Sequence, residues 1–578
     1  DTKQTLEYET ERPNSLYDPS GSFQNINRRY DIVYGDVMLN FNYNIRRFDI
    51  AATLGWTGRY ENMNNMRVST NGGLVTENWF DLNASRYTAS STLQRMELLK
   101  TGYMGTLSLG WDNYLFLELT GRQERSSTLK DQSFFYPSAN LSFLFSTAFR
   151  MPAWWNHGKL RLSYGVVGNA PETYAANIIY EQGSDNGFTW NYVPSSWGNA
   201  NIRPEKKYEY EIGFESKFLN NRLGFDVSYY NNRVKDQILS TPQPSTSGVK
   251  YVLMNVGEVA NEGWDISVSA TPVLTKNFRW DLTANYGIYR NKVVKLADGV
   301  PYLEISNIGG GGAKIQAVEG RPMGDIYVQV PQMNENGEYL VSDKGLYMNQ
   351  TELQRVGNIN PDGVGGLFSS FSYKNIFLDF SIDFRIGGDV INEMYQYSTA
   401  SGLTPESLQF RDTEHGGLSY YYPGNNNASG VPVQVDPSLG AGPNGETVYH
   451  DGVILPGVVA STGEKNTRII PAGYYYNQTY NWGTQPEQLT YRHSVFDNSY
   501  VKLRELTIGY QFPEKLISKL GMTRLSVSVF GRNLFYFYKA LKNYDAESSV
   551  GTSWASQAVV GGSTTATRNF GVSLRASF

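Results

Sequence analysis

The sequence contains no cysteine and only four histidines. Without cysteine there is no disulfide, no thiolate metal site and no cysteine nucleophile. The four histidines are far apart and lack metal-ligand spacing: His157, His415, His450 and His493. No nucleophile elbow, phosphate loop, HExxH or CxxC motif is present, and no two carboxylates are marked as an acid–base pair. We therefore expect neither an enzyme nor a resident cofactor.

Charge and long apolar runs are also scarce. Charged residues make up 18% of the chain, below the quarter usual for soluble domains, and the net charge of −5 gives no reason to expect nucleic-acid binding. No apolar run approaches the length of a membrane-spanning helix, which argues against a helical inner-membrane protein. The first thirteen residues are not a signal peptide, so we expect a mature, processed or incomplete chain.

Aromatic residues and glycine are abundant instead. The chain has 42 tyrosines and 57 glycines, and aromatics reach 14%. With no cysteine and little charge, this composition fits amyloid-like, adhesive or outer-membrane β proteins better than cytosolic enzymes.

The last eleven residues, RNFGVSLRASF, alternate apolar and polar side chains and end on an aromatic residue. Phe570, Val572, Leu574, Ala576 and Phe578 would lie on one face of an extended strand. This segment resembles the C-terminal strand of bacterial outer-membrane β-barrels.

The same alternation recurs along the chain in pairs of segments joined by short turns near Arg46, Asp112, Asn220, Lys276 and Lys374. The polar face carries Asp and Ser, which suits a water-filled lumen better than a sandwich core. A large soluble β-sandwich or β-propeller is the alternative, but many segments are longer than usual strands. We expect a transmembrane antiparallel β-barrel whose lipid-facing residues include Leu115, Leu117, Leu119, Ile376, Leu378, Phe380, Ile382, Val572 and Leu574.

Long polar links alternate with the short turns, as extracellular loops do in outer-membrane barrels. We expect residues 1–27 to be an extracellular loop segment and residues 28–578 to be barrel. The expected long loops lie near 61–95, 170–205, 297–364, 388–497 and 535–567. Their length suggests binding, and their Gly- and Tyr-rich composition favours contact with another surface over a packed core of their own.

The alternation gives about fifteen strands. Single-chain bacterial barrels have an even number, with both ends periplasmic, so an odd count with an extracellular start suggests that upstream strands are missing.

Several segments resemble the SusC-like branch of TonB-dependent outer-membrane transporters. They follow the patterns P-E-x-x-x-x-Y-E, N-x-G-E-x-x-N-x-G and F-R-x-G-G-D, in that order, within residues 201–238, 254–296 and 357–390, and YVKLRELTIGYQFP with VFGRNLF follows at 500–513 and 529–535. The likeness runs from about residue 30 to the end of the chain and is weakest in the long loops.

This resemblance implies a 22-stranded barrel in the outer membrane of a Gram-negative bacterium, with an N-terminal plug and a TonB-binding segment. It also implies a SusD-like surface lipoprotein as a lid, and oligosaccharides or peptides as substrates. No plug or TonB box is found in this sequence, so we expect a C-terminal barrel portion whose partners include the plug and early strands. The alternative is a structural or adhesive outer-membrane barrel without active transport.

Aromatic clusters in the long loops are the candidate substrate-binding residues, because aromatic faces and tyrosine hydroxyls suit sugars and peptide side chains alike. The interfacial aromatic girdle or loop packing is the alternative role. The candidates are Trp190, Tyr192, Trp197, Tyr420, Tyr421, Tyr422, Tyr474, Tyr475 and Trp482, with Tyr476 and Tyr480 in the last cluster.

Two further sets of side chains carry weaker expectations. Asp436 and Asp451 lie in polar loops and have the ligand type that calcium takes, although solvated loop acids are the preferred interpretation. Arg385 and Asp389, in FRIGGD, are expected to pair and anchor a loop at the outer end of a strand.

Overall fold

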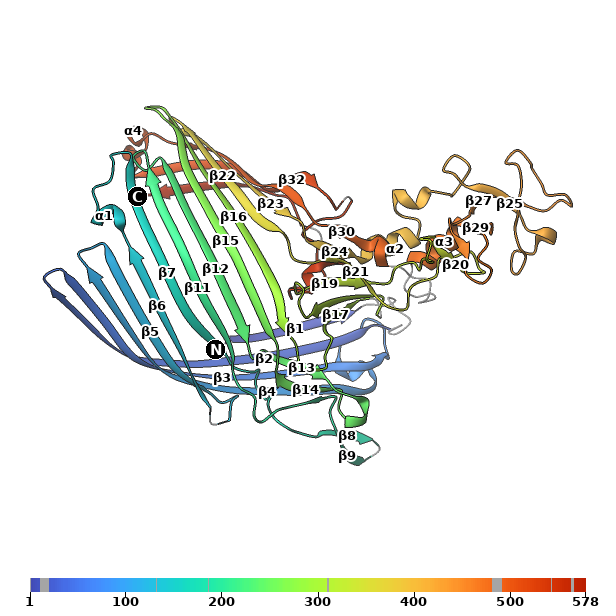
Figure 1. The fold of residues 1–578 in the computed structure, drawn as a ribbon, viewed down its shortest axis with the longest axis horizontal. Helices are drawn as coiled ribbons and strands as arrows, with labels where there is room; N and C mark the ends of the chain where they lie inside the picture. Colours follow the sequence, from blue (N-terminus) through green and yellow to red (C-terminus); the bar gives the residue numbers. More distant parts are fainter. Residues whose placement is uncertain are drawn as a thin grey trace. The chain divides into compact units, whose positions relative to one another are not determined.

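The structure is a computed structural model that describes residues 2–10, 20–130, 132–185, 187–308, 311–480, 491–541, 543–562 and 566–578. One sheet of sixteen strands dominates it, and the expected all-β, antiparallel fold is confirmed (Figure 1). Strands that follow one another along the chain are mostly neighbours in this sheet. In order across the sheet they are β1 (Thr2–Thr10), β2 (Ser22–Ile45), β3 (Phe48–Leu74), β4 (Ser85–Trp111), β5 (Leu115–Ser126), β6 (Ser133–Phe143), β7 (Trp155–Asn169), β11 (Glu205–Phe218), β12 (Leu223–Lys235), β15 (Glu258–Leu274), β16 (Phe278–Lys295), β22 (Gly363–Tyr373), β23 (Ile376–Ile386), β31 (Tyr500–Gln511), β32 (Arg524–Lys539) and β34 (Asn569–Ser577).

The short turns lie where the sequence predicts them. Asp112 and Asn113 adopt φ angles of 53° and 58°, and Asn220 and Asn221 adopt 57° and 62°. Asn and Asp tolerate this left-handed region better than other residues with a side chain, so these pairs reverse the chain tightly.

The strands at the start of the chain are longer than expected. β1 lies within the segment expected to be a loop, and β3 and β4, at 27 residues each, leave a link of only 75–84 where 61–95 was expected. Adding β1 raises the count to sixteen from about fifteen. The strand extensions carry polar residues on both faces, as in ENMNN at 61–65, so alternation cannot reveal them.

Contacts between residues divide the chain into two units. The first contains residues 1–216, 229–260 and 297–300; the second contains 217–228, 261–296 and 301–578.

Outside its long strands, the first unit has two smaller sheets. The hairpin β8–β9 is one, and β10, β14 and β13 form the other. This unit also has a small buried core, formed by Leu129, Phe134 and Ile202. The elements are α1 (Phe145–Ala148), β8 (Glu181–Asp185), β9 (Phe188–Tyr192), β10 (Ser196–Trp197), β13 (Ile238–Pro242), β14 (Tyr251–Asn255), η1 (Leu82–Ala84) and η2 (Ser245–Ser247).

In the second unit the long links fold into small sheets and short helices. Their elements are β17 (Tyr302–Ile308), β18 (Ala313–Val318), β19 (Asp325–Val328), β20 (Leu340–Val341), β21 (Gln354–Asn358), β24 (Asp389–Asn392), α2 (Glu393–Ala400), η4 (Pro405–Leu408), β25 (Leu418–Tyr421), η5 (Pro423–Asn425), β26 (Val433–Gln434), β27 (Val448–Val453), β28 (Val458–Val459), β29 (Ile470–Pro471), α3 (Ala472–Tyr480), η6 (Tyr491–Ser494), β30 (Val495–Asp497), α4 (Glu514–Ile517), η7 (Ser518–Leu520), η8 (Ser556–Ala558) and β33 (Val559–Val560).

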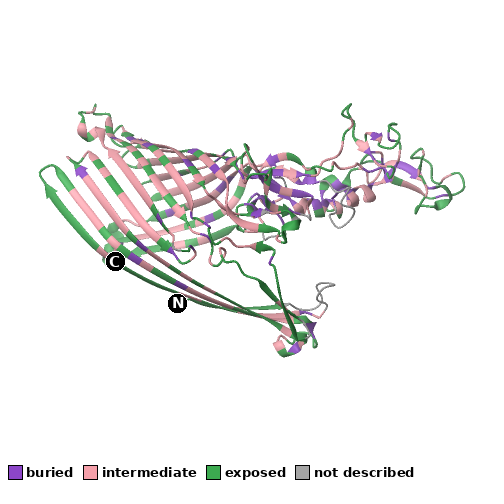
Figure 2. Ribbon diagram, turned by 60° about the horizontal axis from the view of Figure 1, so that its bottom comes forward, coloured by how far each residue is buried: buried purple, intermediate pink, exposed green. Residues whose placement is uncertain are grey.

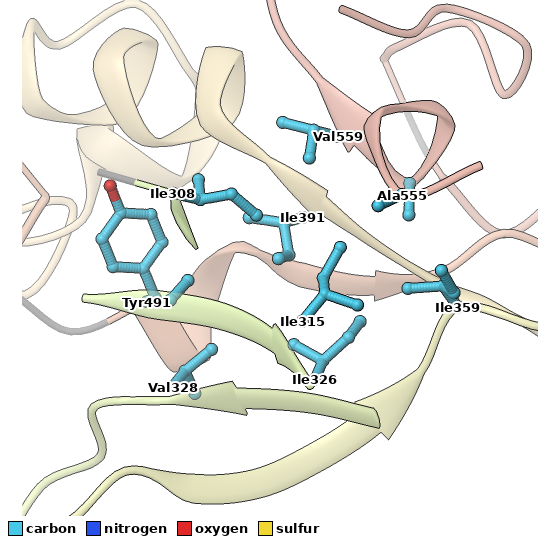
Figure 3. Packing of buried hydrophobic residues seen from close by; sticks show 11 residues of the cluster. Ile308, Ile315, Ile326, Val328, Ile359, Ile391, Tyr491, Ala555 and Val559 are labelled. Carbon is cyan, nitrogen blue, oxygen red and sulfur yellow. The ribbon is translucent and has the colours of Figure 1, made fainter. Parts of the chain in front are cut away.

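These links have a packed core, which corrects the expectation that they would lack one. Ile315 and Ile326 of β18 and β19 are fully buried against Ile391 of β24, Tyr491 and Val559 (Figure 3). In Figure 2 the long strands are mostly intermediate or exposed, whereas buried residues are more frequent in the shorter elements. The core is assembled from short apolar pieces spread over residues 308–559, so composition alone does not reveal it.

Candidate functional site

The register of the first unit separates apolar and polar side chains onto opposite faces of the sheet. Residues that pair across neighbouring strands share a face, because side chains alternate with a period of two. One apolar row runs across β3–β7 through Ile50, Leu109, Leu117, Leu141 and Leu162. The adjacent row on the other face is Ala51, Ser108, Glu118, Asn140 and Ser163.

The polar face of β3–β7 is hollowed by a cavity of about 520 Å³. Asp49, Glu118, Asn140 and Arg161 are among the residues that line it. Glu118 accepts hydrogen bonds from the Ser108 hydroxyl at 3.4 Å and from Asn140 Nδ2 at 3.3 Å. The wall therefore offers charges of both signs and neutral hydrogen-bonding groups.

The second unit has the same division of faces. Asp281, Ser370, Asp379 and Thr507 form a polar row across β16, β22, β23 and β31. The Ser370 hydroxyl donates to Asp379 at 2.6 Å. Leu378, Phe380 and Ile382 alternate with these polar residues along β23 and lie on the opposite face.

A charged cluster, consisting of Lys502, Arg504, Asp383 and Glu547, lies where β31 carries a bulge against β23. Lys502 is only 2% exposed and pairs with Glu547, and its ammonium lies 4.7 Å from the ring centroid of Tyr536. Arg504 Nε donates to Asp383 at 3.0 Å, and its Nη1 donates to Glu547, also at 3.0 Å. Burial opposes ionisation of Glu547, but the hydrogen bonds from Arg504 and Lys502 keep its pKa below the usual value. The cluster ties the link between β32 and β34 to the sheet.

Arg385 and Asp389 anchor a loop, but not through the expected ion pair. Arg385 Nη2 donates to the carbonyl of Ile359 at 3.0 Å, and Asp389 accepts from the backbone N–H of Asn358 at 2.9 Å. Among the described residues, the two side chains form no ion pair with each other, and each binds a backbone group instead. Gly388 has φ 80°, and a Cβ there would lie 2.3 Å from Arg385 Nη2. The F-R-x-G-G-D motif therefore fixes the backbone at 357–359.

The aromatic cluster at 420–422 belongs to the core of its loop. Tyr420 is 1% exposed and packs with Tyr422 and Ile469. Its hydroxyl donates to Asp451 at 3.1 Å, and burial raises the pKa of Tyr420 strongly. Tyr421 is half-buried.

The cluster on α3 is also largely packed. Tyr476 and Tyr480 are buried with Ala472, and burial raises the pKa of Tyr475 to about 12. Tyr474 is half-buried, and Trp482 lies outside the described residues.

The remaining predicted aromatics lie near the β8–β9 hairpin. Trp190 and Tyr192 are 49% and 44% exposed on β9. Trp197 is half-buried on β10, with its ring 5.7 Å from that of Tyr180. Of the three candidate clusters, the one at 190–197 is thus the most open, and its role in substrate binding stays a prediction.

Sequence reasoning missed Phe188, which is 78% exposed on β9. The available signal was its period-two spacing from Trp190 and Tyr192. It also missed the cluster around Lys502, because residues from separate segments meet there only through the fold.

The proposed calcium ligands have protein partners. Asp436 accepts from the backbone N–H of Ser438 at 2.9 Å, and Asp451 accepts from Tyr420. Within the ranges the structure describes, no three His, Cys, Asp or Glu side chains converge as a metal site. No helix among the described residues is long and apolar enough to cross a membrane.

Comparisons with known proteins give consistent matches. A family model described as "TonB dependent receptor-like, beta-barrel" matches residues 2–325. The curated "TonB-dependent receptor P3" of Formosa agariphila is 22% identical over 494 residues, which cover 78% of this chain and 42% of that protein. "TonB-dependent receptor SusC" of Bacteroides thetaiotaomicron is 27% identical over 256 residues, covering 39% of this chain and 24% of that protein.

Among solved structures, the "RagAB peptide transporter" superposes with a TM-score of 0.71 at 18% identity, covering 98% of this chain and 57% of that one. At this identity the likeness is one of fold. The chain spans about half the length of the relatives it matches.

Proposed function

The chain belongs to the TonB-dependent receptor-like β-barrel family of the outer membrane, and from this premise we propose that it is the barrel portion of a nutrient importer. The importer would take up oligosaccharides or peptides, with energy delivered through TonB to its plug. A solved structure of similar fold is a peptide transporter. A likeness of fold does not distinguish between the two substrate classes.

The observation that carries the proposal is the register of the sixteen-stranded sheet. Rows such as Ile50–Leu109–Leu117 suit contact with lipid, and rows such as Ser108–Glu118–Asn140 suit a wet lumen. The cavity on the polar face would give the plug or a passing solute hydrogen-bonding groups of both kinds.

We propose that a SusD-like surface lipoprotein docks on the long loops and encloses the substrate. The folded core of the links 301–362 and 388–497 supports this, because a rigid surface loses less entropy on docking than a disordered one. Of the predicted aromatics, Trp190, Tyr192, Trp197, Tyr421 and Tyr474 keep side-chain surface available to a ligand, whereas Tyr420 and Tyr422 support the loop.

The test is uptake by the native cells. Cells carrying the complete gene should accumulate a labelled peptide or oligosaccharide pool, and cells lacking the gene should not. A protonophore should abolish the difference, because TonB draws on the proton gradient. Extraction in mild detergent should recover a SusD-like lipoprotein with the barrel. Unchanged uptake and growth on every pool without the gene, and purification of the protein alone, would favour the structural or adhesive alternative.

A further inference from the structure

The β8–β9 hairpin presents three aromatic side chains on one face. Phe188, Trp190 and Tyr192 alternate along β9 and are 78%, 49% and 44% exposed. Figure 1 labels the two strands of the hairpin. Residues two apart on a strand lie about 7 Å apart. We call these three residues the aromatic row.

The central ring of the row lies flat on the neighbouring strand. Gly183 pairs with Trp190, and a Cβ built on Gly183 would lie 2.7 Å from Trp190 Cε2. The indole therefore covers the glycine with one face, while about half of the side chain remains in solvent. A ring held in this way offers an open π face without further ordering.

The segment of sequence that carries the row is acidic. Residues 162–202 contain no lysine or arginine and three carboxylates: Glu172, Glu181 and Asp185. Glu181 pairs with Tyr192 across the hairpin and accepts a hydrogen bond from the Tyr192 hydroxyl, which raises the pKa of that tyrosine. A carboxylate thus lies on the same face as the aromatic row, at one end of it.

We propose that this face captures extended peptide segments rich in lysine or arginine. This inference rests on the proposed import function, and it names one substrate class for the importer. A cation over an aromatic face is attracted by the ring quadrupole, most strongly over Trp. Alternate side chains of an extended peptide are also about 7 Å apart, which matches the spacing of the row. Glu181, in a segment (162–202) without lysine or arginine, adds attraction for cations.

A neutral glycan is the competing ligand, since sugar rings also stack on aromatic faces. The two differ in their response to charge and salt. Binding of a basic peptide depends on Glu181 and weakens as salt screens the attraction. Stacking of a neutral sugar depends on Trp190 but responds little to salt or to the charge of Glu181.

The experiment measures fluorescence anisotropy with the complete wild-type protein in detergent. The probes are a labelled dodecapeptide of alternating lysine and serine, its glutamate–serine counterpart, and a neutral glucose hexamer. The lysine peptide should bind best, and less tightly as salt rises. Trp190→Ala should weaken binding of the lysine peptide by about two- to thirty-fold. Gly183→Ala should also weaken it by displacing the indole, and Glu181→Gln should weaken it and flatten the salt dependence.

Thr189→Ala is the matched control, because Thr189 alternates with Phe188 and Trp190 and faces the other side of the hairpin. It should bind like the wild type. Equal affinity for the lysine and glutamate peptides, tighter binding of the glucose hexamer, or full binding by Trp190→Ala would overturn the proposal. Uptake reports separately on the importer: loss of all uptake with intact peptide binding would refute import alone, and intact uptake without charge-selective binding would refute this inference alone.

Discussion

Lys502, a strand residue with only 2% of its side chain exposed, is paired with Glu547 from the link that follows β32. Burying an ammonium is costly unless a counter-charge accompanies it. Glu547 therefore neutralises the charge of Lys502 as long as the link stays attached to β31. The pair joins residues 45 positions apart in the sequence.

Removing the charge of Glu547 should release this link. Glu547→Gln keeps the shape of the side chain but leaves Lys502 without its direct counter-ion, at a cost of about 3 kcal/mol. Hydrogen exchange in residues 543–562 should become faster while exchange in β31 changes little. Glu514→Gln, at an exposed acid, is the control and should have no effect. Unchanged exchange in Glu547→Gln would mean that the pair does not hold the link.

The attachment should also depend on pH. The pKa of Glu547 is below its usual value in the folded chain, so its contribution is complete above the unfolded pKa of about 4.3. It is lost as the pH falls through the folded value. The link should thus be protected at pH 7 and open under acid. Glu547→Gln should show a smaller acid effect, the remainder coming from Asp545, whose pKa is held down against burial by the Tyr536 hydroxyl. An identical acid profile in this variant would contradict the assignment.

The sequence was sufficient for the β class and for the tight turns, because alternation and residues such as Asn220 act locally. It was insufficient where both faces are polar, as in the extensions of β3 and β4. It also misjudged the tyrosines of the loops. Tyr420 and Trp190 look alike as loop aromatics, but Tyr420 is covered by neighbours from residues 449 and 469, whereas Trp190 lies over Gly183 and stays 49% exposed. Burial of this kind depends on contacts distant in sequence.

The buried hydroxyl of Tyr420 gives a test of the loop core. Tyr420→Phe retains the ring, which stacks on Tyr449 at 5.5 Å, but leaves Asp451 without that donor. The loop should lose about 1–3 kcal/mol, measured by hydrogen exchange in β25 and β27. Tyr421→Phe, on the half-buried neighbour, should cost much less. Equal effects of the two substitutions would show that Tyr420 has no special structural role.

The facing of β23 remains a prediction, and adjacent residues provide a matched test. Phe380 lies on the face of β23 that is expected to contact lipid, and Asp379 lies on the polar face, where it accepts from Ser370 at 2.6 Å. Phe380→Arg should destabilise the folded barrel by about 2–4 kcal/mol, because a charge at mid-membrane depth loses its hydration. Asp379→Asn should cost much less, since the lumen is wet and the amide oxygen can still accept from Ser370. Denaturant titration of the complete protein in lipid vesicles measures both. Equal costs would contradict the assigned facing, and a larger cost for Asp379→Asn would reverse it.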